Sequence, residues 1–483
     1  MSDPSESTGS EPTEVKGRRK IWKWLVLLVV VAAAGGWFYT TRYGSSSRPE
    51  LESAGAAASS DVARQDVSSL GWNRFRGPNG TGLSADKSVP LTWGDTENLA
   101  WKMPIPGDGS SSPVVTEHSV FVTSYTREDD SSPEIKDLTR HIYCVDRTSG
   151  EMRWSKSFEA VLPEGKYNGR GLPEHGYATS TTVTDGEHLY VFFGKSGVYC
   201  LDLDGNEVWQ ASVGDGLNRM GWGSCSSPIL YGDIVIVNAG EEASALIALN
   251  KQTGDEVWRS DAPRLPFTFG TPALVDVGDR IEIVIAAVGE IWGLNPKTGK
   301  LVWYATSPIG SNCSPSVVVD GKLVYAFGGY GEKGSICVEA GGRGDVTDSK
   351  VRWTSKHTPY ISTPVVVDGK VCWVDGVKYF ALDAESGDIH SRGRLPAKAS
   401  RNGGRNYASA IAVGGNVLVQ TCRSGVVVLE AGADDMSIVS VNRYSDQSRF
   451  NATPAASNGQ LFLRSDDFLY CVAAIAPGAD STE

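Results

Sequence analysis

The residues able to bind metals or to activate nucleophiles are scattered through this 483-residue chain. No two of its six histidines have the spacing of metal ligands on one strand or helix. Residues 202–207, DLDGNE, begin like a calcium loop but lack the later bidentate Glu, so we expect a turn there. The Gly-rich stretch 328–334 does not have the order of a phosphate loop, and no Gly-x-Ser-x-Gly elbow occurs. The sequence therefore predicts no metal site and no catalytic residue.

Side chains suited to binding gather in short segments that each precede an apolar run. These segments are rich in Arg, Asn and aromatic residues although the protein is acidic. Guanidinium groups and rings favour an anionic or planar ligand, or an acidic or extended peptide. The alternative is that they only hydrogen-bond loop carbonyls; we favour binding most for Arg219, Trp222 and Arg405. The predicted binding residues are His175, Tyr177, Arg219, Trp222, Phe269, Asn312, Tyr360, Arg405, Asn406, Tyr407 and Asn451.

A repeat positions these segments. Its clearest copy, residues 222–258, contains short apolar runs separated by turn residues such as Tyr231-Gly232-Asp233. Each run has the length and composition of a strand, so one copy predicts a four-stranded antiparallel sheet. Such a sheet exposes apolar residues on both faces and needs similar sheets stacked against it. The first runs of eight copies align at Pro113, Thr181, Pro228, Pro272, Pro315, Pro364, Ala410 and Pro454.

A tryptophan ends most copies. Ser391 and Val441 lie near its place in the sixth and seventh copies, and the last copy stops after Cys471 without one. We therefore expect the strand that bears Trp101 to pair with the segment at Cys471 and to close an eight-bladed β-propeller. The segments before the innermost strands then converge at one end of the central funnel. The tryptophans predicted to be structural are Trp101, Trp154, Trp209, Trp258, Trp303 and Trp353.

The repeat resembles that of a known family. Leu/Val-Asp/Asn, then Thr-Gly-Glu/Lys or a close variant, then Trp recurs in residues 144–154, 248–258 and 293–303. This order resembles the tryptophan-docking repeat of the quinoprotein-type, or PQQ-like, propellers, and the resemblance covers about residues 72–475. It implies an all-β fold of eight four-stranded antiparallel blades, in which the Trp of one blade packs on the next. The opening 72–80 also looks like the entry segment of secreted PQQ-like repeat proteins.

The resemblance leaves the function class open. PQQ-dependent alcohol dehydrogenases use an adjacent Cys-Cys disulfide, a calcium ion and a catalytic Asp. This chain has no Cys-Cys pair and lacks their insertions, so we carry over no catalytic residue. We favour the BamB-like, non-catalytic branch, which implies protein partners in the cell envelope and no cofactor. The alternatives are a divergent oxidoreductase that uses PQQ and calcium, and a module that binds envelope polysaccharide through an aromatic funnel mouth.

Four of the eight cysteines occupy one position of the repeat, in its third strand. Ala248, Gly293 and Ala381 fill that position in other copies. A small buried slot explains this pattern better than a disulfide or a metal does. Nothing in the sequence shows whether Cys225 and Cys313 meet. The four equivalent cysteines are Cys144, Cys200, Cys337 and Cys471.

The first 70 residues predict a tail, an anchor and a linker. Residues 1–20 are mostly polar and are expected to be disordered and cytoplasmic. Basic residues then precede an apolar run, which predicts a membrane helix over 21–40; a signal peptide cleaved near Ala34 is the alternative. The first cysteine is Cys144, so no lipidated cysteine is expected near the N-terminus, unlike in BamB. Residues 41–70 predict a flexible linker, 71–475 the propeller and 476–483 a disordered tail.

The acidic charge of the chain excludes one class of partner. The formal net charge is −12, which argues against nucleic acid. From the apolar run over 21–40, we expect a single-pass protein of the inner membrane whose propeller faces the periplasm or another extracytoplasmic side.

Overall fold

The computed structural model describes residues 48–53, 71–127, 135, 137–164, 175–216, 222–396, 406–423, 425–432 and 435–475. The chain divides into two compact units, Met1–Ser47 and Arg48–Glu483, and all described residues belong to the second. The predicted membrane helix over 21–40 and the predicted tails over 1–20 and 476–483 lie outside the described residues. Within the described residues no helix is long and apolar enough to span a membrane.

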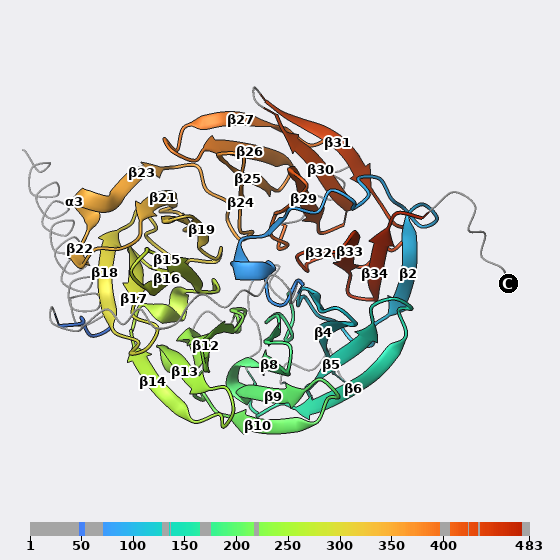
Figure 1. Ribbon diagram of the computed structural model, residues 1–483, viewed down its shortest axis with the longest axis horizontal. Helices are drawn as coiled ribbons and strands as arrows, with labels where there is room; N and C mark the ends of the chain where they lie inside the picture. The colour runs from blue at the N-terminus through green and yellow to red at the C-terminus, as the bar shows by residue number, and fades with distance from the viewer. Residues whose placement is uncertain are drawn as a thin grey trace, which may run out of the picture. The chain divides into compact units, whose positions relative to one another are not determined.

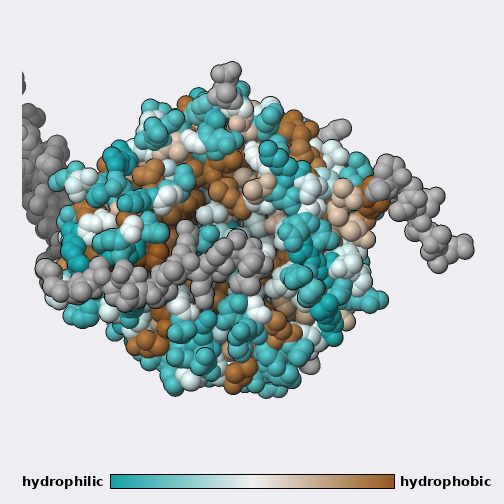
Figure 2. All heavy atoms as spheres, viewed as in Figure 1, coloured by the Kyte–Doolittle hydropathy of each residue, from teal (hydrophilic) through white to brown (hydrophobic). Residues whose placement is uncertain are grey.

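The second unit is a ring of eight β-sheets, each built around an antiparallel four-stranded meander (Figure 1). Each sheet is one blade, so the predicted all-β eight-bladed propeller is confirmed. Buried Val, Ile, Leu and Phe of neighbouring blades pack together in shared clusters, because no single sheet can bury both of its apolar faces. Hydrophilic residues cover much of the face seen in Figure 2, with apolar residues scattered among them.

The first four blades follow the chain in order. Blade 1 consists of β3 (Val114–Val115), β4 (Ser119–Thr126), β5 (Thr139–Asp146) and β6 (Met152–Glu159). Blade 2 consists of β7 (Val183–Thr184), β8 (His188–Phe192), β9 (Val198–Asp202) and β10 (Glu207–Ala211), with the 3-10 helix η4 (Gly194–Ser196) between β8 and β9. Blade 3 consists of β11 (Ile229–Tyr231), β12 (Ile234–Ala239), β13 (Ala245–Asn250) and β14 (Glu256–Asp261), with α2 (Gly240–Ala243) inside it and η5 (Leu265–Phe267) after it. Blade 4 consists of β15 (Ala273–Asp276), β16 (Ile281–Ala287), β17 (Glu290–Leu294) and β18 (Leu301–Thr306).

The remaining blades complete the ring. Blade 5 consists of β19 (Val318–Asp320), β20 (Leu323–Gly328), β21 (Gly334–Glu339) and β23 (Val351–Ser355), with β22 (Gly344–Asp345) and α3 (Thr347–Lys350) inserted before β23. Blade 6 consists of β24 (Val365–Val367), β25 (Lys370–Asp375), β26 (Lys378–Asp383) and β27 (Ile389–Arg394). Blade 7 consists of β28 (Ile411–Val413), β29 (Asn416–Thr421), β30 (Gly425–Ala431) and β31 (Met436–Asn442). Blade 8 consists of β32 (Ala455–Ser457), β33 (Gln460–Arg464), β34 (Phe468–Ala473) and β2 (Leu99–Pro104).

The ring closes in blade 8, where the start and the end of the propeller meet (Figure 1). Strand β2 pairs antiparallel with β34, and Trp101 lies opposite Cys471. The predicted closure is therefore confirmed, and neither end of the repeat array leaves an open blade face.

The entry segment 71–84 lies across one end of the central channel, and Figure 1 shows its 3-10 helix η3 (Pro78–Gly80) in the middle of the ring. Trp72 pairs with Val115 of blade 1, and the short strand β1 (Leu83–Ser84) pairs with β28 of blade 7. The buried Arg76 guanidinium donates to the carbonyl oxygens of Ala410 and Pro364, both at 2.7 Å. We call residues 71–84 the plug, because they tie several blades together across the axis.

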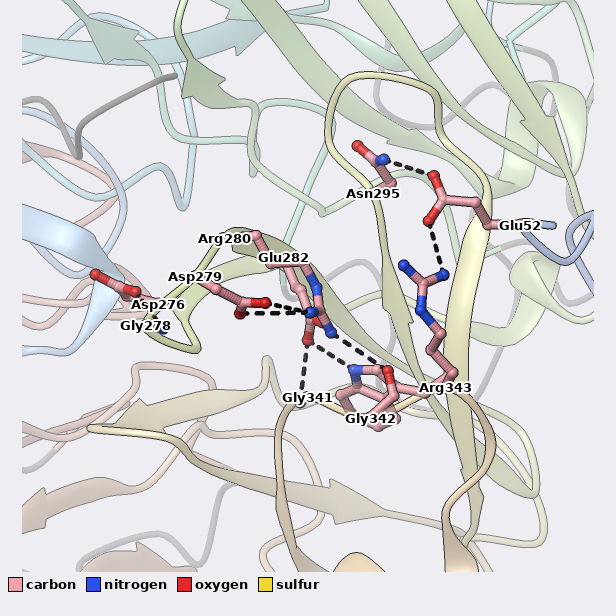
Figure 3. Close-up of polar contacts among 11 residues, drawn as sticks. Glu52, Asp276, Gly278, Asp279, Arg280, Glu282, Asn295, Gly341, Gly342 and Arg343 are labelled. Atoms are coloured by element: carbon pink, nitrogen blue, oxygen red, sulfur yellow. Dashed lines mark hydrogen bonds and ion pairs between the residues drawn. The ribbon is translucent and has the colours of Figure 1, made fainter. Parts of the chain in front are cut away.

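Part of the predicted flexible linker over 41–70 is held on blade 4, which corrects that prediction for residues 48–53. The amide of Glu52 donates to the Leu301 carbonyl oxygen, and the Leu301 amide donates to the Glu50 carbonyl oxygen, both at 2.8 Å. Glu52 also accepts from Asn295 at 2.6 Å and pairs with Arg343 at 3.5 Å (Figure 3). Backbone pairing at Leu301, on the part of the β18 edge that β22 does not cover, therefore holds residues 48–53 despite their polar composition. We call them the clip.

All eight cysteines are free thiols. Cys144, Cys200, Cys337 and Cys471 lie on β5, β9, β21 and β34, and all four are buried. The prediction of a buried slot in the third strand is confirmed. Cys225 and Cys313 form no disulfide.

Candidate functional site

A closed ring of Ser and Thr residues surrounds the axis where the innermost strands begin. In each blade the backbone amide of one such residue donates to the side-chain hydroxyl of its counterpart in the next blade, at 2.9 to 3.1 Å. The last of these bonds runs from Thr453 of blade 8 to Ser112 of blade 1. The hydroxyl ring consists of Ser112, Thr181, Ser227, Thr271, Ser316, Thr363, Ser409 and Thr453.

The hydroxyl ring corrects two of the predicted repeat positions. Pro113 directly follows Ser112, whereas Thr181 is itself a ring residue and Pro315 comes one residue before Ser316. The alignment of the copies rests on a proline. In blade 2 this proline is missing and Thr181 is aligned in its place, and in blade 5 it precedes the ring residue instead of following it. The bonding position is a hydroxyl residue in all eight blades.

A second tier lines the axis two residues before the hydroxyl ring. Side chains of an extended chain alternate in direction, so residues two apart face the same way. All eight members border one cavity, together with the hydroxyl ring. The second tier consists of Ser110, Thr179, Cys225, Phe269, Ser314, Ile361, Tyr407 and Asn451.

Four further side chains complete the cavity. Phe75 comes from the plug, which contacts the innermost strands beyond the hydroxyl ring. The phenyl group of Phe75 therefore closes the cavity at the plug end. His175, Trp222 and Tyr360 come from the segments before the innermost strands and border the other end, the mouth. Trp222 and Phe269 form a tilted pair with ring centroids 5.3 Å apart, and Tyr360 packs beside Tyr330 at 5.6 Å. The cavity is therefore a cup with an aromatic mouth.

The polar groups of the mouth are uncharged. Burial lowers the pKa of His175 to about 4, and its hydrogen bonds to the Trp222 and Gly176 backbone offset only part of this effect. Burial likewise raises the pKa of the Cys225 thiol. At neutral pH both groups are therefore uncharged, and the Cys225 thiol is a poor nucleophile.

The cavity has a volume of about 130 Å³, and its described lining contains no Asp, Glu, Lys or Arg. Each hydroxyl of the ring accepts a backbone N–H bond, and none donates its own proton to a protein group within the described residues. The cup therefore presents hydroxyl donors in a belt between aromatic ends. Among the described residues no group of three or more His, Cys, Asp or Glu is arranged to hold a metal ion.

The predicted binding residues fall into three groups. His175, Trp222, Phe269, Tyr360, Tyr407 and Asn451 line the cavity. Tyr177, Asn312 and Asn406 do not: Tyr177 packs edge-on against Tyr125, Asn312 donates to Ser314 at 3.1 Å, and Asn406 donates to the Gly376 carbonyl oxygen at 3.1 Å. Arg219 and Arg405 lie outside the described residues. The binding role of the lining residues stays a prediction.

Reasoning from the sequence missed the hydroxyl ring and the inward position of Phe75. Ser or Thr directly before Pro is visible at Ser112, Ser227, Thr271, Thr363 and Thr453. That recurrence is a signal from which the ring could have been predicted. Phe75 lies before the first copy of the repeat, so the repeat pattern does not predict that it enters the channel.

Five of the six predicted structural tryptophans dock on the next blade. Each donates its indole N–H to a backbone carbonyl oxygen there at 2.8 to 3.0 Å. Each also lies against a glycine that has a positive φ, such as Gly150 under Trp101. Trp303 departs from this prediction, because its N–H bonds Glu282 of its own blade at 2.6 Å. The docking residues are Trp101, Trp154, Trp209, Trp258 and Trp353.

Comparison with known families agrees with this architecture. Residues 138–348 match the family model described as outer membrane protein assembly factor BamB. The PQQ-like, BamB-like resemblance drawn from the repeat is thereby confirmed. No curated protein sequence matches the chain.

Solved structures share the fold at low identity. BamB from Moraxella catarrhalis aligns with a TM-score of 0.55 and 14% identity, over 77% of this chain and 96% of that one. A europium-containing methanol dehydrogenase aligns with 0.55 and 10%, over 83% and 98%. The quinohemoprotein alcohol dehydrogenase from Comamonas testosteroni aligns with 0.53 and 11%, over 89% and 85%. The fold is thus common to a protein of outer-membrane assembly and to two dehydrogenases.

Proposed function

We propose that this chain, which carries the repeat of the BamB family model and the PQQ-like propeller fold, is a non-catalytic binding scaffold of the cell envelope. It binds a component of the envelope in its axial cup and does not turn it over. The observation that carries the proposal is the cup itself, to which all eight blades contribute side chains. A concave site with aromatic walls and a few convergent polar groups is the usual form of a binding pocket.

The proposal includes a location. The apolar run over 21–40 anchors the chain in the inner membrane, and the propeller faces the periplasm or another extracytoplasmic space. Partners are envelope components rather than nucleic acid, in keeping with the net charge of −12.

The rival function, PQQ-dependent oxidation, requires residues that the described lining does not offer. PQQ carries carboxylates and works with a bound divalent cation, so its site needs cationic side chains and oxygen ligands such as Asp or Glu. The described lining has neither, and its Ser, Thr and aromatic side chains do not fit the cofactor. The scaffold is therefore the better supported function.

Retention of envelope material on the immobilised full-length chain tests the proposal. Solubilised envelope extract is passed over the native protein, the cup variant Trp222→Ala and the rim variant Tyr330→Ala. Tyr330 is 69% exposed and does not line the cup, so it is a matched aromatic control. We expect a component that the native and Tyr330→Ala proteins retain, that Trp222→Ala loses, and that is eluted with unchanged mass.

Two results would overturn the scaffold. Retention that is equal for all three proteins would place binding outside the cup. Reduction of a dye by alcohols or sugars after addition of PQQ and calcium, with a matching rise in thermal stability, would establish the rival function.

A further inference from the structure

We infer that the axial cup takes one uncharged sugar ring, a neutral pyranose at the end or on a branch of an envelope glycan. This inference rests on the proposed function, because it names the ligand class of the same site. It depends on three features of the cup: where its polar groups lie, where its apolar groups lie, and the absence of charge from its described lining.

The polar groups form a belt around the axis. The eight hydroxyls of the ring come from eight blades, so they surround whatever lies on the axis from all sides. Each has one lone pair engaged by a backbone amide, which fixes the oxygen in place and leaves the O–H proton and a second lone pair for a ligand. Their preferred ligand therefore carries both donors and acceptors around its circumference.

The apolar groups close the two ends of this belt. Phe75 lies at the plug end, Trp222 and Tyr360 border the mouth, and Phe269 and Tyr407 are the aromatic members of the second tier on the mouth side. A ligand that lies across the axis would meet hydroxyls at its edge and aromatic rings at its faces. A pyranose has this distribution, because its hydroxyls point outward and its C–H groups form the two faces.

A phenol or phenyl group matches the cup less well. Its edge is apolar except at one position, so most of the ring hydroxyls would lose water without gaining a hydrogen bond. Its faces would be satisfied, but its circumference would not. The belt of eight hydroxyls therefore favours the sugar over an aromatic side chain of a partner protein.

Charge and size agree with a single neutral ring. The described lining has no cation for a sugar acid and no carboxylate for an amino sugar. The volume of about 130 Å³ is close to that of an engineered cavity of about 150 Å³ that holds benzene. A volume of this size accommodates one six-membered ring.

Titration of the full-length protein with simple glycosides tests the inference. The probes are the methyl glycosides of glucose, galactose, mannose and N-acetylglucosamine, followed by tryptophan fluorescence and by calorimetry. At least one is expected to bind saturably, and Trp222→Ala should lower its affinity about tenfold through loss of the stacking face. Tyr330→Ala should change the affinity less than about twofold. The glucuronide and the glucosaminide are expected to bind more weakly than their neutral counterparts.

A matched pair of variants tests the belt itself. Thr271→Val removes a hydroxyl and should lower sugar affinity several-fold, whereas Thr271→Ser keeps it and should leave affinity nearly unchanged. Thr271→Val also deprives the Ser227 amide of its acceptor, so it can destabilise the fold. Ser110→Ala removes a lining hydroxyl of the second tier instead, and within the described residues that hydroxyl makes no hydrogen bond, so a loss of sugar affinity there is separate from any loss of stability.

The outcomes separate this inference from the proposed function. Saturable binding of p-cresol without binding of any glycoside overturns the sugar inference and leaves a binding scaffold. Tighter binding of a charged sugar overturns the neutral class. If no glycoside binds and envelope retention is also insensitive to Trp222→Ala, both proposals fail.

Discussion

Two neighbouring blade junctions use a tryptophan of the same repeat position in opposite ways. At the junction of blades 3 and 4, Trp258 lies on Gly299 of the next blade and donates to the Pro296 carbonyl oxygen at 2.9 Å. At the junction of blades 4 and 5, Trp303 turns back onto its own blade and bonds Glu282. The same residue type at the same repeat position therefore meets a backbone carbonyl in one place and a buried carboxylate in the other.

The difference follows from what the next blade offers. In blade 5 the short Gly-containing turn is replaced by residues 340–350, which include β22 and α3. The insertion instead pairs with β18 itself, where Trp303 lies opposite Gly344 of β22. Its own third strand has Gly293 opposite it, where Cys or Ala stands opposite the docking tryptophans, and a Cβ there would lie 2.1 Å from the indole. The absence of that side chain lets Trp303 lie over its own blade.

Glu282 takes over the bond between the blades (Figure 3). Its side chain is fully buried and accepts from Arg280 at 2.6 Å and from the Gly341 amide of blade 5 at 3.2 Å. Arg280 in turn donates to the Gly342 carbonyl oxygen at 3.2 Å. The comparison teaches that a propeller can replace a docking tryptophan with a charge network when an insertion removes the partner turn.

Loss of the Glu282 network should be the largest single effect. Glu282→Ala leaves the Trp303 N–H and the Gly341 amide without their acceptor. Arg280 then keeps only Asp279 and the Gly342 carbonyl oxygen. We expect a loss of about 3 to 5 kcal/mol in the free energy of unfolding, measured by chemical denaturation. Glu256→Ala, which removes an exposed ion pair with Arg259, should cost less than about 1 kcal/mol. Equal effects would show that the network does not hold this junction.

Two glycines with nearly equal φ separate docking from backbone strain. Gly299 has φ +69 and a Cβ there would lie 2.4 Å from the Trp258 ring, whereas Gly344 has φ +66 and open space. Gly299→Ala should cost about 3 kcal/mol, as overpacking adds to strain, and Gly344→Ala about 1 to 2 kcal/mol from strain alone. Denaturation midpoints measure both. Identical losses in the two variants would show that contact with Trp258 adds nothing to the cost of strain.

At the junction of blades 2 and 3 a buried carboxylate, Glu242, has no arginine of the described residues bonded to it, unlike Glu282. Glu242 accepts from Ser224 at 2.6 Å. Burial is the main cause that raises its pKa, the Ser224 bond opposes it, and the net pKa is about 7. The folded pKa of Glu242 exceeds its ordinary value. The contribution of this group to the free energy of unfolding is therefore greatest at low pH and falls as pH rises from about 4.5 to about 7.

Replacement of Glu242 should abolish that part of the pH dependence. Glu242→Gln should be more stable than the native protein by on the order of 2 kcal/mol at pH 8, with little difference at pH 5. Glu241→Gln, on the same short helix, is the control. Thermal unfolding between pH 5 and 8 measures this, and a native-like slope in Glu242→Gln would contradict the assignment.

A variant of the clip should lose the least stability, because the clip pairs with the edge of a blade that folds without it. Glu52→Ala removes the contacts to Asn295 and Arg343 and should cost less than about 1 kcal/mol. It should also speed hydrogen exchange of the Leu301 amide, which donates to Glu50. Glu50→Ala removes only an exposed pair with Lys300 and should leave that exchange unchanged. Equal exchange rates in the two variants would mean that backbone pairing alone holds the clip.

Much of the fold could be predicted because the spacing of the repeat indicates which strands pair and which blades are neighbours. The Gly-to-Trp spacing predicted the docking of Trp154, Trp209 and Trp258, and the position of Trp101 predicted the closure on β34. The reversal of Trp303 could not be predicted from its own copy, since it depends on an insertion in the following blade. The clip was missed because its polar residues pair through their backbone.

The candidate site shows the same division. The sequence by itself determined how many blades there are, which strand closes the ring, and that aromatic residues such as Trp222 and Tyr407 precede innermost strands, because these features recur at a fixed spacing along the chain. Only the tertiary structure decided that eight Ser and Thr side chains meet on one axis and that Phe75 closes their cup. The physical reason is that a ring of hydrogen bonds between blades joins residues 44 to 69 positions apart, and across the closure 341 apart, so no local pattern contains it.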